Sequence, residues 1–225
     1  MDRTLEQLID ATPWGPTLDA DERARLLRET VVRTVPADGL VVGKGGVVDA
    51  WIGIVSGLVK IAAFSVDGRS VTFTGVPAGG WLGEGSMLKD EPRRYDVVAL
   101  RDSRIAYVPR STFQRLLDTS LPFNRFLLRQ LNERLGQFIA MVEYERLLGP
   151  DARVARCIAQ LFNPILYPGL GPRLEISQSE IGYLTGLSRQ RANQALQALE
   201  AAGLLKVEYG GITIVDLAGL WSFGA

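Results

Sequence analysis

Residues 177–203, SQSEIGYLTGLSRQRANQALQALEAAG, contain two helix starts separated by one short turn. Ser177 followed by Glu180 predicts a capping box, in which each side chain accepts a hydrogen bond from the other residue's backbone N–H. Gly186 supplies the backbone freedom that a tight helix exit needs, and Ser188 can cap the second helix. Two helices joined by so short a turn are held at an angle, as in a helix-turn-helix.

The second helix has two faces of different composition. One face is apolar and must be buried: Ala192, Ala195, Leu196 and Leu199. The other holds one guanidinium and four amides, with no acid before Glu200: Arg189, Gln190, Asn193, Gln194 and Gln197. An ordinary solvated face would mix Glu and Lys, whereas Arg pairs with guanine and Asn or Gln pairs with adenine in the major groove. We interpret the polar face as a DNA-reading surface; the alternative is a structural helical hairpin whose polar face is incidental.

The segments on either side complete a small domain. Gly203 marks the end of the second helix, and LLKVEYGGITIVD then predicts a hairpin turning at Gly210 and Gly211, the wing of a winged helix. On the other side, Gly149 and Pro150 end the preceding helix, and Asp151 can cap the helix in ARVARCIAQLFNPIL.

Residues 31–108 consist of short apolar runs rich in Val, Ile, Gly and aromatic residues. Asp67 and Gly68, between KIAAFSV and RSVTFTGV, predict a two-residue hairpin because both positions must tolerate positive φ. Many short strands with frequent turns predict a compact β-roll. A short helix capped at Asp19 or Asp21 precedes it, and the RDSR of residues 101–104 is interpreted as a solvated turn. The tryptophans are expected in the core or an interface: Trp14, Trp51, Trp81 and Trp221.

A long helix is predicted over residues 121–148, which have no proline beyond the first turn and one glycine. A short helix in PRSTFQRLLD precedes it, with Ser111 as the expected cap. The apolar positions of the long helix fit a heptad seam: Leu121, Leu128, Leu131, Leu135, Phe138 and Val142. It is either an amphipathic helix lying on its own β domain or a helix that also packs against its twin in a dimer. Further apolar residues widen the stripe beyond one seam, which favours the dimer.

The counts of reactive residues exclude several kinds of chemistry. The chain has no histidine and one cysteine, Cys157, so it cannot form His-ligated haem, an iron–sulfur cluster, a His-containing zinc site or a Ser-His nucleophile. We expect Cys157 to be buried and unreactive. No coherent catalytic set is present, and we predict that the protein is not an enzyme and binds no metal.

Charge and hydropathy leave the partner open. Lys plus Arg and Asp plus Glu both number 25, so the net charge points to no partner class. No apolar run approaches the roughly 18 residues of a membrane span, and the first residues lack the layout of a signal peptide. We expect a cytoplasmic protein without a membrane partner.

A β-roll, a long helix and a winged helix in this order resemble the Crp/Fnr family of transcription regulators, over nearly the whole chain. The most specific part is residues 177–205. The resemblance implies an α+β fold with a cyclic-nucleotide-binding-type β-roll (jelly roll) over residues 1–118. It also implies a dimerisation helix over residues 119–149 and a winged helix-turn-helix over residues 150–225.

The resemblance also implies roles on the DNA. Arg189, Gln190 and Gln194 would read bases, although the family often has Glu at the position of Gln190; Asn193 shares their face. Four further residues would contact phosphate or position the helix: Ser177, Ser179, Ser188 and Arg191.

The effector half of the resemblance rests on GEGSMLKDEPRRYDVVAL. Gly83 and Glu84 match the family's Gly-Glu pair, and Arg94 matches its phosphate-binding arginine by spacing; the alternative for Arg94 is a surface arginine paired with Glu84 or Glu91. Tyr95 replaces the usual hydroxyl residue and Asp96 the usual small one. Phe138 stands where cyclic-AMP binders place a residue against the purine. The effector alternatives are cyclic AMP, cyclic di-GMP, another small molecule or none.

The function implied is a homodimeric transcription regulator that reads a near-palindromic site on double-stranded DNA. Its half-sites would lie about 10–10.5 base pairs apart, centre to centre. RNA polymerase would be a partner if the protein activates transcription. The alternative is a nucleotide-binding regulatory module that acts on a protein partner and does not bind DNA.

Overall fold

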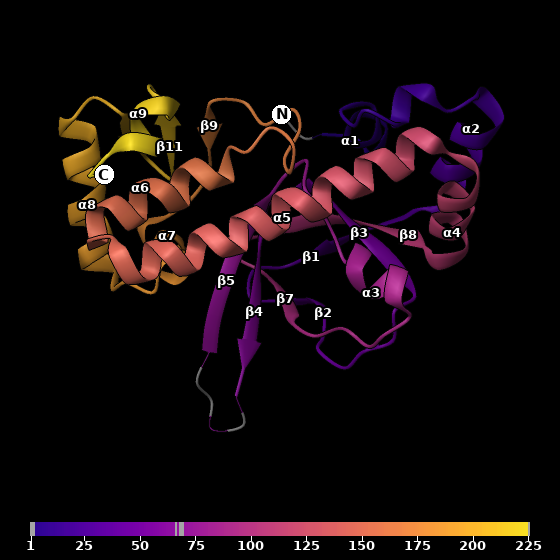
Figure 1. The fold of residues 1–225 in the computed structure, drawn as a ribbon, viewed down its shortest axis with the longest axis horizontal. Helices are drawn as coiled ribbons and strands as arrows, with labels where there is room; N and C mark the ends of the chain where they lie inside the picture. Colours follow the sequence, from indigo (N-terminus) through magenta and orange to yellow (C-terminus); the bar gives the residue numbers. More distant parts are fainter. Residues whose placement is uncertain (1–2, 66, 68–69, 225) are drawn as a thin grey trace.

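The computed structural model describes residues 3–65, 67 and 70–224. An N-terminal β-roll, the long helix α5 (Leu121–Leu147) and a C-terminal helical domain follow one another along the chain. Helix α5 runs the length of the molecule, from the N-terminal helices to the C-terminal domain (Figure 1). This arrangement confirms the predicted α+β fold of β-roll, long helix and winged helix-turn-helix.

The β-roll consists of two four-stranded antiparallel sheets. The first has the order β1 (Val31–Val35), β8 (Ser103–Pro109), β3 (Ala50–Ser56), β6 (Trp81–Leu82). The second has the order β2 (Leu40–Val42), β7 (Asp96–Ala99), β4 (Leu58–Phe64), β5 (Ser70–Pro77). Strands β4 and β5 pair from Leu58 opposite Pro77 to Phe64 opposite Ser70, which confirms that the two segments form antiparallel partners, while the two-residue turn stays a prediction. Gly68, one of its two expected turn residues, lies outside the described residues.

The outer face of the first sheet is covered by helices, so β3 is buried along nearly its whole length. The helices are α1 (Leu5–Asp10), α2 (Ala20–Glu29), α4 (Arg110–Thr119) and the start of α5. Trp14, Trp51 and Trp81 are fully buried beneath them, and the last two stack with ring centroids 4.0 Å apart. A side chain at Gly53 would place its Cβ 2.7 Å from the Trp81 ring, so this strand position requires glycine. Trp221 is 39% exposed and is not part of the core, so of the two places expected for it only an interface stays a prediction.

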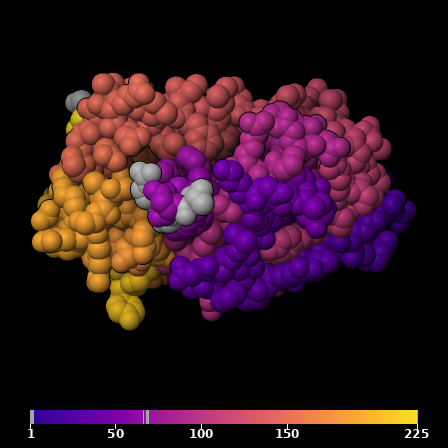
Figure 2. Space-filling model, turned by 90° about the horizontal axis from the view of Figure 1, so that it is seen from below, coloured from indigo at the N-terminus to yellow at the C-terminus, as the bar shows by residue number. Residues whose placement is uncertain are grey.

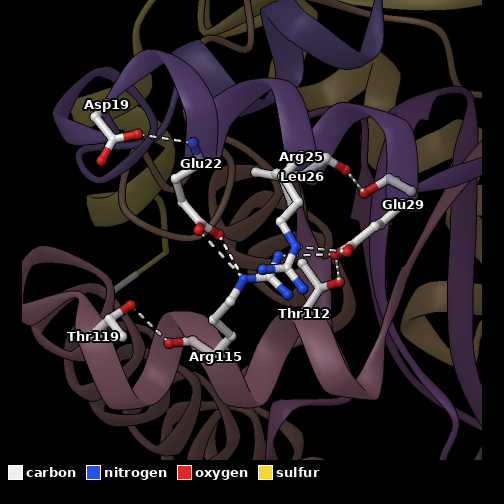
Figure 3. Close-up of polar contacts among 9 residues, drawn as sticks. Asp19, Glu22, Arg25, Leu26, Glu29, Thr112, Arg115 and Thr119 are labelled. Carbon is white, nitrogen blue, oxygen red and sulfur yellow. Dashed lines mark hydrogen bonds and ion pairs between the residues drawn. The ribbon is translucent and has the colours of Figure 1, made fainter.

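Polar contacts hold α2 against α4 (Figure 3). The Arg115 guanidinium binds Glu22 at 3.0 Å and Glu29 at 2.8 Å. Hydrogen bonds from Thr112, Arg25 and Arg115 lower the pKa of Glu29 to about 2. Asp19, one of the two predicted caps, accepts a hydrogen bond from the Glu22 N–H and begins α2.

The C-terminal domain contains four helices and a three-stranded sheet among the described residues. These are α6 (Pro150–Leu161), β9 (Arg173–Leu174), α7 (Gln178–Thr185), α8 (Arg189–Ala201), β10 (Leu205–Glu208), β11 (Gly211–Ile214) and α9 (Leu217–Ser222). The capping box of Ser177 and Glu180 is present, Gly186 has φ +67°, and the Ser188 hydroxyl accepts the Arg191 N–H. The predicted apolar face of α8 is buried, as expected.

Three local predictions are wrong, two of helix caps and one of a hairpin turn. Prolines at the helix starts decide the two caps, and strand pairing decides the turn. Pro109 is the N-cap of α4, so Ser111 already lies within the helix. Gly149 is the N-cap of α6 with Pro150 in its first turn, and Asp151 lies within that turn. Glu208 pairs with Gly211, so the wing turns at the two residues between them, one position earlier than expected.

Candidate functional site

The polar face of α8 is open to solvent. Arg189, Gln190 and Gln194 are exposed, and none of them forms a hydrogen bond or ion pair within the described part of the chain. The first turn of α8 contains no acid. Its free N–H groups and the helix dipole therefore favour an anion at this end. This surface has the hydrogen-bonding groups that recognise base edges.

The other predicted DNA residues have partners within the protein. Asn193 is half-buried, and its amide oxygen accepts a hydrogen bond from Gln178 at 2.7 Å. Arg191 forms an ion pair with Asp151 at 2.6 Å, which raises the pKa of Arg191. The Ser177 and Ser188 hydroxyls act as helix caps. These residues fix the position of α8 in this conformation.

A groove of about 310 Å³ separates α8 from the wing. Ser177, Ser179 and Arg189 line one side, and Tyr209 and Gly210 of the wing line the other. Tyr209 is fully exposed at the wing tip. The groove therefore joins the helix starts to the wing in one continuous surface.

Arg101 connects the β-roll to this surface. It lies in the turn between β7 and β8, and its Nε and Nη2 donate to both carboxylate oxygens of Glu180 at 3.2 and 2.6 Å. Its Nη1 donates to Glu175 at 3.4 Å. Arg101 is only a quarter exposed, so the interpretation of residues 101–104 as a solvated turn is wrong. Glu180 is the acid in the first turn of α7, and Arg101 neutralises it.

The C-terminal domain also packs on the β4–β5 hairpin. A Cβ at Gly75 of β5 would touch Leu161 and Leu184 at 3.0 and 3.1 Å, and Lys60 of β4 lies over the Tyr183 ring. Seen from below, this hairpin lies against the C-terminal domain, drawn in orange (Figure 2). Strands β4 and β5 are thus in direct contact with α7, the first helix of the helix-turn-helix.

A second cluster of polar groups lies inside the β-roll. Gly83, with φ +94°, caps the short helix α3 (Glu84–Lys89), in which Glu84 is 5% exposed. Arg93 is 3% exposed and donates from Nη2 to the Ala50 carbonyl at 2.6 Å. A Cβ at Gly83 would lie 2.7 Å from Arg93 Nη1, so glycine permits this close approach. Glu84 Oε2 and Arg93 Nε and Nη1 have no hydrogen-bond partner among the described residues.

Arg94, the arginine chosen by spacing, is not part of this cluster. Its side chain is 74% exposed and forms an ion pair with Glu91 at 2.7 Å, the alternative weighed from the sequence. Asp96 accepts the Lys44 N–H and thereby holds a loop. Phe138 is half-buried against Phe73 of β5. Of the five expected effector residues, the structure brings together Gly83, Glu84 and Tyr95.

Electrostatic effects link Tyr95 to the cluster. Burial raises the pKa of Tyr95 to about 12, with a further contribution from the Glu84 charge. Arg134, Arg93 and a hydrogen bond from the Gly83 backbone oppose this increase. Tyr95 is therefore a neutral hydroxyl beside Glu84 and the Gly83 backbone.

Helix α5 supplies buried polar side chains that the sequence reasoning missed. Arg134 donates to the Trp81 carbonyl at 3.0 Å and the Tyr167 hydroxyl at 3.3 Å. Burial opposes its charge, but Tyr167, Glu84 and Tyr95 outweigh that effect and raise the pKa of Arg134. Gln130, one turn earlier, is fully buried, and neither of its amide atoms has a partner among the described residues. The only sign of these side chains in the sequence is that polar residues interrupt the apolar stripe of this helix.

Comparison with known proteins assigns both halves of the chain. Residues 32–120 match the cyclic nucleotide-binding domain family, and residues 152–223 match the Crp-like helix-turn-helix domain family. The chain belongs to the Crp/Fnr family. This Crp/Fnr protein is a transcription regulator with a cyclic nucleotide-binding domain and a helix-turn-helix DNA-binding domain, and the family consists of regulators rather than enzymes.

Similar proteins cover nearly the whole Crp/Fnr regulator. The CRP-like protein Clp of Xanthomonas campestris is 28% identical over 215 residues, which cover 92% of each chain. The cAMP-activated global transcriptional regulator CRP of Haemophilus influenzae is 23% identical over 210 residues, covering 92% of this chain and 90% of that protein. The solved structure of the c-di-GMP responsive global regulator CLP of X. campestris is 25% identical. It covers 87% of this chain and 99% of its own, with a TM-score of 0.59.

Other reactive groups of this Crp/Fnr regulator are few. Burial raises the pKa of the half-buried Cys157 thiol to about 12, which makes it a poor nucleophile. Within residues 3–65, 67 and 70–224, no group of His, Cys, Asp and Glu side chains could hold a metal ion. Among the same residues, no helix is both long and apolar enough to cross a membrane.

Proposed function

We propose that this Crp/Fnr regulator reads DNA by placing α8 in the major groove, with Arg189, Gln190 and Gln194 on the base edges. The observation that carries the proposal is the exposure of these three side chains without partners in the described part of the chain. Each good bidentate pair with a base would contribute about 1–3 kcal/mol of discrimination. Gln190 and Gln194 favour adenine, and Arg189 favours guanine.

The groups around α8 would fix its register on the phosphates. The N-termini of α7 and α8, at Ser177 and Ser188, are suited to phosphate by dipole and free N–H groups. Ser179 lines the groove beside them. Arg191 would contact phosphate, either with its ion pair to Asp151 intact or after that pair breaks. Asn193 would hold α8 in position through its hydrogen bond with Gln178.

We further propose a homodimer formed along α5. The exposed side of α5 carries a row of large apolar side chains that water would otherwise contact: Leu121, Leu128, Leu135, Ile139 and Val142. Their heptad-like spacing suits a paired helix. Two protomers related by a twofold axis would present two α8 helices to a near-palindromic site. If the regulator activates transcription, RNA polymerase is its further partner, and its DNA target implies a cytoplasmic location.

For the effector we propose a cyclic mono- or dinucleotide bound at the buried cluster of the β-roll. Relatives of this chain are named for activation by cAMP and for response to c-di-GMP. Glu84 can accept hydrogen bonds from a hydroxyl, and Arg93 can donate two to a phosphate. Arg93 replaces Arg94 in this role because only Arg93 is buried beside Gly83.

Calorimetry with cyclic AMP and cyclic di-GMP tests the effector proposal. We expect Arg93→Ala to abolish binding of whichever nucleotide binds, whereas Arg94→Ala, its exposed neighbour, keeps the wild-type affinity. Loss of binding in Arg94→Ala but not in Arg93→Ala would contradict the assignment, as would no binding of either nucleotide to the wild type.

A salt titration of binding to random double-stranded DNA tests the DNA proposal against a module that acts only on a protein partner. Phosphate contacts make the logarithm of the affinity fall linearly with the logarithm of the salt concentration. We expect such a slope for the wild type. A protein-only module would show no salt-dependent binding to DNA.

A further inference from the structure

A cavity away from both sites described above lies where α5 meets the N-terminal segment. It has a volume of about 430 Å³ and falls between Pro13, the first turns of α5 and residues 164–168. Pockets of about 300–1,000 Å³ are the usual size for small-molecule ligands. Neither α8 nor the Glu84 cluster contributes to it.

The cavity is apolar except at two positions. Pro122, Phe126, Ile165 and other apolar residues line it, together with the guanidinium-bearing Arg125 and Arg129. These arginines stand one helical turn apart on α5, and both are exposed. No acid lines the cavity, and within the described chain neither arginine has a hydrogen bond or ion pair. Two unpaired cations beside an apolar wall are complementary to an anion that carries an apolar body.

The walls are held in place by contacts outside the cavity. Arg3 donates to the carbonyls of Pro168 and Gly169 at 3.4 and 2.7 Å. Asn163 accepts the Ile165 and Leu166 N–H groups and donates to Glu133 of α5 at 3.1 Å. The segment between α6 and β9 is therefore tied to both the N-terminal segment and α5, and the N-terminal segment and α5 lie side by side in Figure 1. The cavity is formed before any ligand enters.

We propose that this cavity binds a small amphipathic anion, with its carboxylate or phosphate head on Arg125 and Arg129 and its hydrocarbon part against Phe126 and Ile165. Such a ligand would bridge the N-terminal segment, α5 and the segment between α6 and β9. The regulator would thus respond to a small molecule of a different chemical class from the nucleotide proposed for the β-roll.

Calorimetry on the full-length protein tests the site, with decanoate, decyl phosphate and decanol below the concentrations at which they form micelles. We expect saturable binding of at least one of the two anions, and the head that binds distinguishes a carboxylate from a phosphate ligand. Decanol, which lacks the charge, should bind about tenfold more weakly or worse, since charged hydrogen bonds are lost.

Matched variants locate the binding. Arg125→Ala/Arg129→Ala should weaken the anion about tenfold or more, and Ile165→Glu should abolish binding by placing an acid in the cavity. Arg146→Ala, an exposed arginine at the end of α5, should leave it unchanged. No anion binding to the wild type, or equal binding to the double variant, would overturn the proposal. Because no DNA or nucleotide is present, the result does not depend on the functions proposed above.

Discussion

Replacing Arg101 by alanine removes the contact that ties the β-roll to the first helix of the helix-turn-helix. The change deletes two hydrogen bonds to Glu180 and one to Glu175. It also leaves the Glu180 carboxylate, whose side chain is 9% exposed, with only the cap contacts of Ser177. A buried charge that loses its partner is strongly destabilising, about 3–5 kcal/mol when both groups are fully buried.

The effect here should be smaller because Arg101 is 25% exposed and water can reach the site. We expect a loss of about 2 kcal/mol, within the range for hydrogen bonds to charged groups. For a chain of this size, that corresponds to a fall in Tm of about 4–8 °C. Calorimetric or circular dichroism melting measures it directly.

The control is Arg173→Ala, which removes ion pairs with Glu208 and Glu175. The three side chains are 48%, 41% and 67% exposed. Exposed pairs contribute about 0–1 kcal/mol, so its Tm should fall by no more than about 2–4 °C. In a Glu180→Gln background, Arg101→Ala should have little further effect, because the glutamine side chain keeps the cap and has no charge. Equal melting of the two alanine variants, or additive effects in the double variant, would show that Arg101 does not stabilise the protein through Glu180.

Other substitutions test the dimer, the α2–α4 contact and the helix turn. Leu135→Glu should convert the dimer to monomers in sedimentation equilibrium, whereas Leu40→Glu, with the same 60% exposure on β2, should not. The pKa of Glu29 falls from its usual 4.5 to about 2, so its carboxylate stabilises the fold fully above pH 4.5 and less as pH falls toward 2. Glu29→Gln should therefore lower Tm at pH 7, and the difference should shrink between pH 4.5 and 2. Gly186→Ala, at φ +67°, should destabilise by about 1 kcal/mol or more, whereas Gly136→Ala, inside α5, should stabilise by about 0.5–1 kcal/mol. Urea unfolding that shows the same sign for both glycine variants would contradict this account of the turn.

Features that depend on neighbouring residues were predictable from the sequence. The capping box at Ser177, the helix end at Gly186 and the buried face of α8 follow from contacts within a few residues. The same holds for the β4–β5 pairing and for the length of α5. These patterns also sufficed to predict the exposed face of α8, because a buried apolar stripe fixes where the opposite face points.

Features that depend on distant partners were not predictable. Arg93 and Arg94 are adjacent in the loop before β7, and the packing of that loop on the β-roll decides that Arg93 is buried and Arg94 exposed. The spacing of the family's phosphate-binding arginine from its Gly-Glu pair selected Arg94, which is the exposed residue. Arg101 was interpreted as part of a surface turn because its partner Glu180 is distant in sequence. Gln130 and Arg134 stand as breaks in an apolar stripe, and only the packed β-roll shows that they are buried.

DNA reading by α8 can be tested by selecting binding sites from random double-stranded DNA with the wild type and with Arg189→Ala, with and without cyclic nucleotides. The wild type should enrich a twofold-symmetric sequence with half-sites about 10–10.5 base pairs apart. Arg189→Ala should lose the preference at one symmetric pair of positions. Enrichment of no sequence under any condition, or of the same sequence by both proteins, would contradict DNA reading by α8.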